Sequence, residues 1–244
     1  MSEATLYDAR AYLERSFQAK GIGGWRSLYL SFIEELAPRA VIELGAGAPD
    51  FLERVEAARR VAVDAGRHYA GEYRARGIEF SCRDLERDEL DDLGPVDVAI
   101  CSDVFEHLIN PAVALDKIAG LLGDHGLLFS HVPNEYRLGH VLRVMLSARP
   151  TVQFHRGAQE WDDPHFHRFS DIGYRNFLAR RFQFNLKLSD LRYGRAARLL
   201  RRVGLAVPYC LEGGPTYAST NDERIFARLT ELKKARFQKA GLRG

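Results

Sequence analysis

Cysteine is scarce in this chain of 244 residues, and long apolar runs are absent. Its three cysteines, Cys82, Cys101 and Cys210, lie far apart and form no C-x-x-C pair. We therefore expect neither a disulfide framework nor a zinc knuckle. No run of about 18 apolar residues occurs, so hydropathy predicts no membrane-spanning helix. Early acidic residues argue against a signal peptide, and we expect a cytoplasmic protein.

Net charge is also small. The formal charge is +2 at pH 7, so bulk charge does not mark the chain as a polyanion binder. Hydrophobic residues make up 46% of the sequence, which is ordinary for a protein with a real core. The length fits one large α/β domain better than two small ones. The basic residues are mostly arginine, which we attribute to a bacterial genome's composition.

The most informative stretch is an apolar segment that ends in two glycines. Residues 40–44 are predicted to form a buried strand, and Gly45 and Gly47 follow it. Glycines there let the backbone turn tightly and approach a ligand without an interfering Cβ. Pro49 suits the first position of a helix, which we expect to continue to about Arg59. Strand, glycine turn and helix together are typical of nucleotide-binding sheets.

Strands and helices alternate along the rest of the chain, which favours one parallel sheet. Residues 1–38 are expected to form a helical cap, and Asn110 with Pro111 suits the N-cap and first residue of another helix. Further strands are predicted at 60–64, 78–82, 96–101, 127–132, 182–188 and 224–229, and further helices after Tyr174 and over 191–203.

Acidic residues follow two of these strands. Asp64 lies about 20 residues past the glycine turn, the spacing of an acid that binds ribose hydroxyls. The alternative is that Asp64 caps the next helix. Asp84 follows the third strand in an acidic stretch, residues 84–92, which we otherwise interpret as a solvated surface.

With these pieces in order, the chain resembles class I S-adenosylmethionine-dependent methyltransferases, in particular ubiquinone-biosynthesis-type and small-molecule O-methyltransferases. The matching motifs are Glu43-x-Gly45-x-Gly47, Asp64, Asp84-Leu85, Asp103-Val-x-Glu106-His107-Leu108-x-Asn110-Pro111 and the strand ending in Pro133-Asn134. The resemblance implies a Rossmann-like, seven-stranded, mostly parallel sheet with helices on both faces and an antiparallel last strand. It also implies a cap at 1–38 and a methyltransferase domain at 39–244, with an insertion at about 135–169.

The resemblance also implies a role for each motif residue. Glu43 would accept a hydrogen bond from the methionyl ammonium, Asp64 would hold the ribose hydroxyls, and Asp84 would accept from the adenine amino group. Each pairs a carboxylate with a donor. The full expected set for S-adenosylmethionine and its product S-adenosylhomocysteine is Arg26, Glu43, Gly45, Ala46, Gly47, Asp64, Asp84, Leu85, Ser102 and Asp103.

Pro49 departs from the family, which usually has a third glycine there. Proline offers no N–H toward the cofactor carboxylate, and Arg26 or Tyr29 could compensate. Loss of activity is the alternative, which would leave a catalytically silent scaffold. A dinucleotide-binding dehydrogenase fits worse, because its fingerprint needs glycine where Asp50 stands.

Methyl transfer to an alcohol needs a group that removes a proton. Candidates at the predicted strand ends are His107, His165 and His167, but for any one of them a structural role is favoured over a catalytic one. His131, Asn134, Arg137 and Trp161 are the candidate acceptor contacts. A metal site made of His155, His165 and His167 is not expected, because their spacing matches no ligand motif.

The basic segment 174–203 holds nine basic residues and one acid, Asp190. It is either a solvated face or a dock for an anionic acceptor or a membrane surface. No nucleic-acid module is recognisable. The sequence therefore predicts a methyltransferase that O-methylates a small molecule or a glycan, with an RNA or protein methyltransferase as the alternative.

Overall fold

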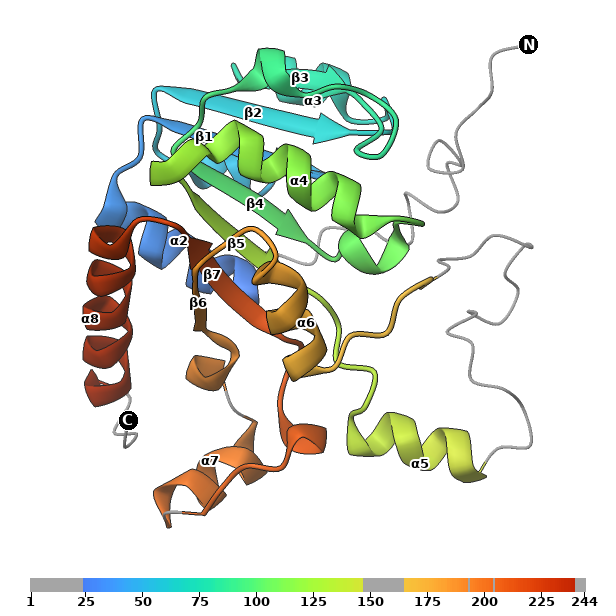
Figure 1. Cartoon of the computed structure of the whole chain (residues 1–244), viewed down its shortest axis with the longest axis vertical. Coiled ribbons are helices and arrows are strands. Elements are labelled where there is room, and N and C mark those ends of the chain that lie inside the picture. The colour runs from blue at the N-terminus through green and yellow to red at the C-terminus, as the bar shows by residue number, and fades with distance from the viewer. Residues whose placement is uncertain (1–23, 147–164, 193, 204, 240–244) are drawn as a thin grey trace.

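The protein is built around a seven-stranded sheet (Figure 1). The computed structural model describes residues 24–146, 165–192, 194–203 and 205–239. The strand order is β3-β2-β1-β4-β5-β7-β6; six strands run one way, and β7 is antiparallel to both neighbours. The strands are β1 Ala40–Leu44, β2 Arg59–Asp64, β3 Glu79–Cys82, β4 Val98–Ser102, β5 Leu127–His131, β6 Phe184–Lys187 and β7 Thr216–Thr220. This confirms the predicted Rossmann-like α/β fold.

Helices cover both faces of the sheet. One face packs against α4 and α6 through Leu115, Ile118 and Tyr174, and the other packs against α2 and α8 through Phe32 and Leu229. In Figure 1, α5 and α7 lie away from the sheet. The helices are α2 Trp25–Leu36, α3 Ala70–Ala75, α4 Pro111–Leu122, α5 Leu138–Leu146, α6 Asp171–Leu178, α7 Arg195–Arg202 and α8 Glu223–Lys239.

The three central strands are apolar on both sides, as a sheet covered by two helical layers requires. Every residue of β1 after Ala40 is buried, and so are the first four residues of β4 and of β5. In β4 and β5 only the polar last residues, Ser102 and His131, are partly exposed. The fold therefore gathers polar side chains at one edge of the sheet.

The helix expected between Pro49 and about Arg59 is wrong. The chain makes one turn, in which the Pro49 carbonyl accepts from the Glu53 N–H (3.0 Å), and a 3-10 helix at Leu52–Arg54 ends it. Val55 is already extended. The Arg60 guanidinium donates to the carbonyls of Leu52 and Glu53 (3.3 and 3.5 Å). Those carbonyls are therefore taken by a side chain instead of by a continuing helix.

The predicted position of the last strand is also wrong. Residues 224–229 lie in α8, and the strand is Thr216–Thr220, whose five residues are all buried despite their polar composition. Asp222 starts the helix, because its carboxylate accepts from the Arg224 N–H (2.8 Å). Ile225, Leu229 and Leu232 then repeat at helical spacing toward the core.

Part of the acidic stretch 84–92 is structural instead of merely solvated. The Glu86 carboxylate accepts from the Ile109 N–H (3.1 Å) and the Asn110 N–H (2.6 Å). It thereby satisfies donors before α4, whose predicted N-cap Asn110 makes no side-chain capping bond. Pro111 does occupy the first helical turn, as predicted. An acid at a helix N-terminus also complements the helix dipole.

Several expectations concern residues outside the described ranges. Only residues 24–38 of the cap are described, and there Tyr29 and Phe32 of α2 pack on Phe129 of β5. His155 and Trp161 lie outside the described residues. Within the described part of the chain, no helix is both long and apolar enough to cross a bilayer.

The reassigned helix α8 gives a test of the fold. Leu229 is fully buried, so Leu229→Ala should lower the free energy of unfolding by about 2–5 kcal/mol. Glu231→Ala on the exposed face of α8 should change it by less than about 0.5 kcal/mol. Urea unfolding followed by circular dichroism measures both. Equal effects of the two variants would contradict the packing of α8 on the sheet.

Candidate functional site

The carboxyl ends of the parallel strands form one edge, where ligands of open α/β sheets bind. Glu43 is the penultimate residue of β1, and Asp64, Ser102 and His131 are the last residues of β2, β4 and β5. Backbone pairing sets Ser102 directly opposite His131. The fold therefore brings together side chains that are far apart in the sequence.

Glu43 is a buried acid. It is 2% exposed, and no group in the described part of the chain hydrogen-bonds to its Oε2 atom. Burial raises the pKa of Glu43 to about 8; the Arg26 guanidinium, with Nη2 4.0 Å from Oε1, opposes this shift, and Asp64 adds to it. A buried acceptor without a hydrogen-bond donor is costly, and a cationic ligand at this position would relieve that cost.

The glycine turn after β1 is tightly packed and orients Asp64. Gly45 has a φ of +68°, and an added Cβ would lie 2.3 Å from Cγ2 of Val104. Gly47, also at positive φ, donates its N–H to Oδ2 of Asp64 (2.9 Å), and Gly66 donates to Oδ1 (2.8 Å). These two bonds orient the Asp64 carboxylate at the end of β2.

The next pair of predicted residues follows β3. Asp84 accepts from the Glu86 N–H (2.8 Å) and lies 3.7 Å from the Arg87 Nε. Leu85 is buried in the core cluster that packs against α4. Asp84 is thus held in a turn with its side chain partly open to solvent.

Asp103 has a strained backbone. Its φ of 55° lies in the left-handed region, which non-glycine residues rarely adopt. Its N–H donates to the carbonyl of His131 (3.0 Å), which holds the turn after β4 in place. Such strain costs about 1–3 kcal/mol and concentrates at functional sites.

His131 has a defined tautomer. Thr216 Oγ1 donates to the Gly214 carbonyl (3.0 Å) and lies 2.8 Å from Nδ1 of His131. Because the hydroxyl proton is used, Nδ1 must be the donor and Nε2 an acceptor. Nε2 lies 3.6 Å from Asp103 Oδ1, and Trp25 stacks on the ring at 5.4 Å. Burial lowers the pKa of His131, so the ring is neutral near pH 7.

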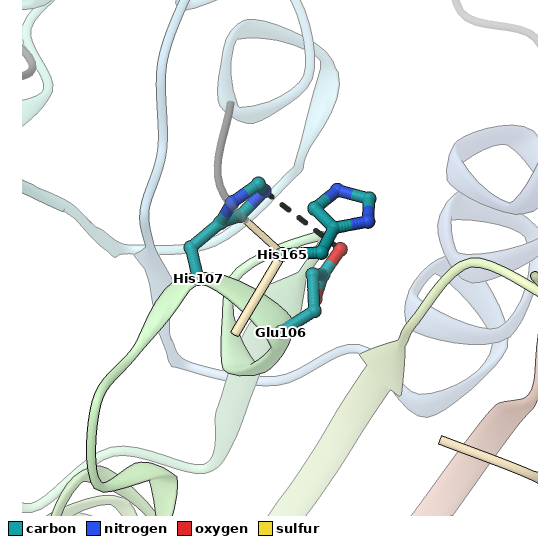
Figure 2. Close-up of side chains that lie close together, drawn as sticks. All are labelled: Glu106, His107 and His165. Carbon is teal, nitrogen blue, oxygen red and sulfur yellow. Dashed lines mark ion pairs between the residues drawn. The ribbon is translucent and has the colours of Figure 1, made fainter. Parts of the chain in front are cut away.

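Two more predicted histidines meet at this edge. His107 and His165 lie with ring centroids 4.7 Å apart, and Glu106 is buried beside them, as Figure 2 shows. Glu135 Oε1 contacts Nδ1 of His165 at 2.5 Å. His167 instead points its Nε2 at the carbonyl of Ile109 (3.2 Å).

The sequence reasoning missed Glu106 and Glu135 as site residues. Glu106 lies inside the Asp-x-x-Glu-His motif, so the motif could have identified it as a site residue. Glu135 had no local signal, because its partner His165 is 30 residues away.

Two other predicted acceptor contacts, Asn134 and Arg137, do not join the histidines. Asn134 donates to the carbonyls of Tyr209 and Glu212 and accepts from the Tyr136 N–H. Its amide therefore holds two loops together. Arg137 is exposed.

Comparison with known proteins identifies the family of the chain. The sequence model of a methyltransferase domain matches residues 17–186. The chain belongs to this methyltransferase family. It is a methyltransferase, and S-adenosylmethionine is the cofactor that the sequence resemblance implies. No curated protein matches the chain in sequence.

Solved structures share the fold at low sequence identity. An S-adenosylmethionine-dependent methyltransferase from Clostridium acetobutylicum is 13% identical with a TM-score of 0.59, covering 88% of this chain and 98% of its own. The methyltransferase bound to the Haloferax volcanii Trm112 activator is 17% identical, with a TM-score of 0.56 and coverages of 89% and 97%. A DhpI complex with S-adenosylhomocysteine is 15% identical, with a TM-score of 0.53 and coverages of 90% and 97%. At these identities the likeness supports the fold alone.

The residues at the edge of the sheet fit the cofactor. The open Oε2 of Glu43 suits an ammonium, the oriented Asp64 suits a ribose diol, and the turn at Gly45 admits no side chain. Pro49 supplies no N–H, and Arg26 is the nearest described cation to Glu43. Tyr29 is fully buried against Phe129, with its hydroxyl near Ser102 and Asp103 at this edge.

Gly45→Ala should weaken binding of S-adenosylhomocysteine and destabilise the protein, because the new methyl group would clash with Val104. Gly77→Ala is the matched control: Gly77 also has a positive φ, of +65°, but open space around its Cβ position. It should lose only about 1–2 kcal/mol of stability and keep its affinity. Calorimetry and thermal unfolding measure both, and the account fails if Gly45→Ala binds as the wild type does.

The raised pKa of Glu43 predicts a pH dependence. The folded protein holds this proton up to about pH 8, whereas the ordinary carboxyl value is 4.5. Its contribution to stability therefore falls as pH rises from 4.5 to about 8. An ammonium needs the ionised carboxylate, so affinity for S-adenosylhomocysteine should rise roughly tenfold per pH unit below that pKa.

Calorimetry between about pH 6 and pH 8 measures this dependence. Glu43→Gln should bind more weakly with no such slope. Glu79→Gln, an exposed partner of Arg59, should keep the wild-type slope. A flat wild-type profile would argue against the ammonium contact.

Proposed function

We propose that this methyltransferase transfers the methyl group of S-adenosylmethionine to an oxygen of a small molecule or a sugar. The observation that carries the proposal is the neutral, oriented imidazole of His131 beside Asp103. Because an alcohol is a weak nucleophile until its proton is removed, a general base of this kind serves an oxygen acceptor.

The cofactor would be held by the residues on the β1 and β2 side of the edge. Glu43 would contact the ammonium, Asp64 the ribose hydroxyls and Asp84 the adenine amino group. When bound, the sulfonium supplies a methyl group that is already activated for displacement. The protein then needs to align the acceptor and exclude water.

His131 would act from the β4 and β5 side. Nε2 accepts the acceptor proton, and the carboxylate of Asp103, 3.6 Å away, stabilises the imidazolium that forms. Thr216 keeps Nδ1 protonated and so keeps Nε2 available. Trp25 covers one face of the ring and limits access of water.

Three further points, on domains, membrane contact and acceptor, belong to the proposal. We propose that residues 1–38 form a cap, that 39–244 form the methyltransferase domain and that the insertion at about 135–169 adds to the acceptor side. The membrane-surface interpretation of 174–203 is supported by exposed Leu199 and Val203 near Arg198 on α7. A glycan acceptor remains a prediction from the sequence.

The acceptor class can be tested with cofactor labelled in its methyl group. We expect label to enter ethers or esters when a panel of hydroxylated small molecules and sugars is supplied. Label in bulk RNA or peptide alone, with none in hydroxylated compounds, would contradict the proposal. His131→Asn should lower kcat by about 10²–10⁴-fold while leaving the binding of S-adenosylhomocysteine intact.

Two variants control this experiment. His125→Asn removes an exposed histidine that precedes β5, at the opposite end of the strand, and should keep full activity. Thr216→Val should retain the base but lose the tautomer control, so its pH–rate profile should shift while S-adenosylhomocysteine binding stays. If His131→Asn were as active as His125→Asn, His131 would not be the base.

A further inference from the structure

Three side chains from two separate segments converge beside the loop that follows β4. Glu106 and His107 belong to a 3-10 helix, Phe105–His107, which follows β4, and His165 precedes α6. One ligand atom from each residue can be chosen so that all three lie within 4.8 Å of one another. Oε1 of Glu106 lies 3.9 Å from Nε2 of His107. Figure 2 shows the Glu106 carboxylate close to both imidazoles.

Hydrogen bonds between the two segments hold these side chains together. The His167 N–H donates to the carbonyl of Glu106 (3.1 Å), and Nε2 of His167 lies 3.2 Å from the carbonyl of Ile109. The segment that carries His165 is therefore tied to the turn that carries Glu106 and His107. The three side chains meet because the fold fixes both segments.

A second carboxylate orients His165. Glu135 Oε1 lies 2.5 Å from Nδ1 of His165, and its Oε2 lies 2.8 Å from Nε of Arg168. In the neutral ring, Nδ1 as the hydrogen-bond donor to Glu135 makes Nε2 the nitrogen that can bind a metal. A carboxylate that fixes the tautomer of an imidazole in this way is the usual support of a metal-binding histidine.

Charge also favours a cation here. The Glu106 carboxylate is 1% exposed, and a cation beside it would be attracted more strongly there than in water, because the surroundings have a low dielectric constant. The nearby imidazoles offer lone pairs when neutral. Two such nitrogens and one carboxylate oxygen form a typical donor set for divalent first-row transition metals, whereas Mg²⁺ and Ca²⁺ prefer oxygen alone.

We propose that Glu106, His107 and His165 bind a divalent transition-metal cation that holds the acceptor oxygen. Three protein ligands leave at least one position open, as in catalytic metal sites. This inference rests on the proposed O-methylation. It departs from the sequence-based expectation of no metal, which considered His155, His165 and His167; only His165 belongs to this cluster.

The cation would act as a Lewis acid without changing its oxidation state. It lowers the pKa of the bound acceptor hydroxyl, and the proton leaves to Nε2 of His131. The oxygen then forms its bond to the methyl carbon, and the electron pair of the broken carbon–sulfur bond remains on sulfur. An acceptor with a second oxygen on the adjacent carbon could fill another open position.

Metal binding can be measured without any acceptor. The full chain is stripped with a chelator, dialysed and titrated with Co²⁺ alone, and the visible absorption of the ion reports its coordination. We expect one Co²⁺ per chain, displaced by Zn²⁺. His165→Ala and His107→Ala should lose this binding. His125→Asn, which removes an exposed histidine elsewhere, should keep it.

A variant that leaves all three ligands in place guards against misfolding. Glu135→Gln should weaken Co²⁺ binding about 10–100-fold through loss of the supporting carboxylate, with an unchanged circular dichroism spectrum. No saturable Co²⁺ binding by the wild type, or wild-type binding by His165→Ala, would overturn the proposal.

S-adenosylhomocysteine binding separates the two hypotheses. The stripped protein and His165→Ala should both bind it as the wild type does. The proposed cofactor contacts Glu43 and Asp64 lie on β1 and β2 and are not ligands of the proposed metal. Intact binding of S-adenosylhomocysteine without any Co²⁺ binding refutes the metal site alone. Loss of S-adenosylhomocysteine binding in the wild type would instead refute the proposed function.

Discussion

The buried carboxylate of Glu43 is the constraint on which the rest of the site depends. It lies near the end of a central strand, where every other residue after Ala40 is apolar and buried. The structure gives it one distant cation, Arg26 at 4.0 Å, and a raised pKa. A neutral side chain there would be more stable, so the acid makes sense as a contact for a ligand that brings its own positive charge.

The same edge of the sheet divides into two chemically different halves. The β1 and β2 half offers oriented acceptors and a turn without side chains, which suits the hydroxyls and ammonium of a nucleoside-linked amino acid. The β4 and β5 half offers imidazoles, with His131 buried and neutral and His165 held by Glu135. Strain at Asp103 marks the boundary between them.

Sequence alone predicted the sheet, the positions of most strands and the acids at their ends, because buried parallel strands read as short apolar runs. It failed where a distant side chain decided the local structure. Arg60 ends the turn after Pro49, and Glu86 takes the donors before α4. It also failed at Thr216–Thr220, a buried strand whose residues are mostly polar and so lack the apolar pattern of the other strands. Contacts across long sequence separations, such as Glu135 with His165, leave no local pattern to find.

The central claim is that Glu43 is protonated in the free protein and binds the ligand ammonium in its ionised form. Carbon-13 NMR of the glutamate side-chain carboxyls, assigned with Glu43→Gln, measures its titration directly. The account predicts a pKa of about 8 without ligand and, because an ammonium favours the ionised form, a value below about 7 with S-adenosylhomocysteine bound. An ordinary carboxyl pKa in the free protein, or one that the ligand leaves unchanged, would contradict it.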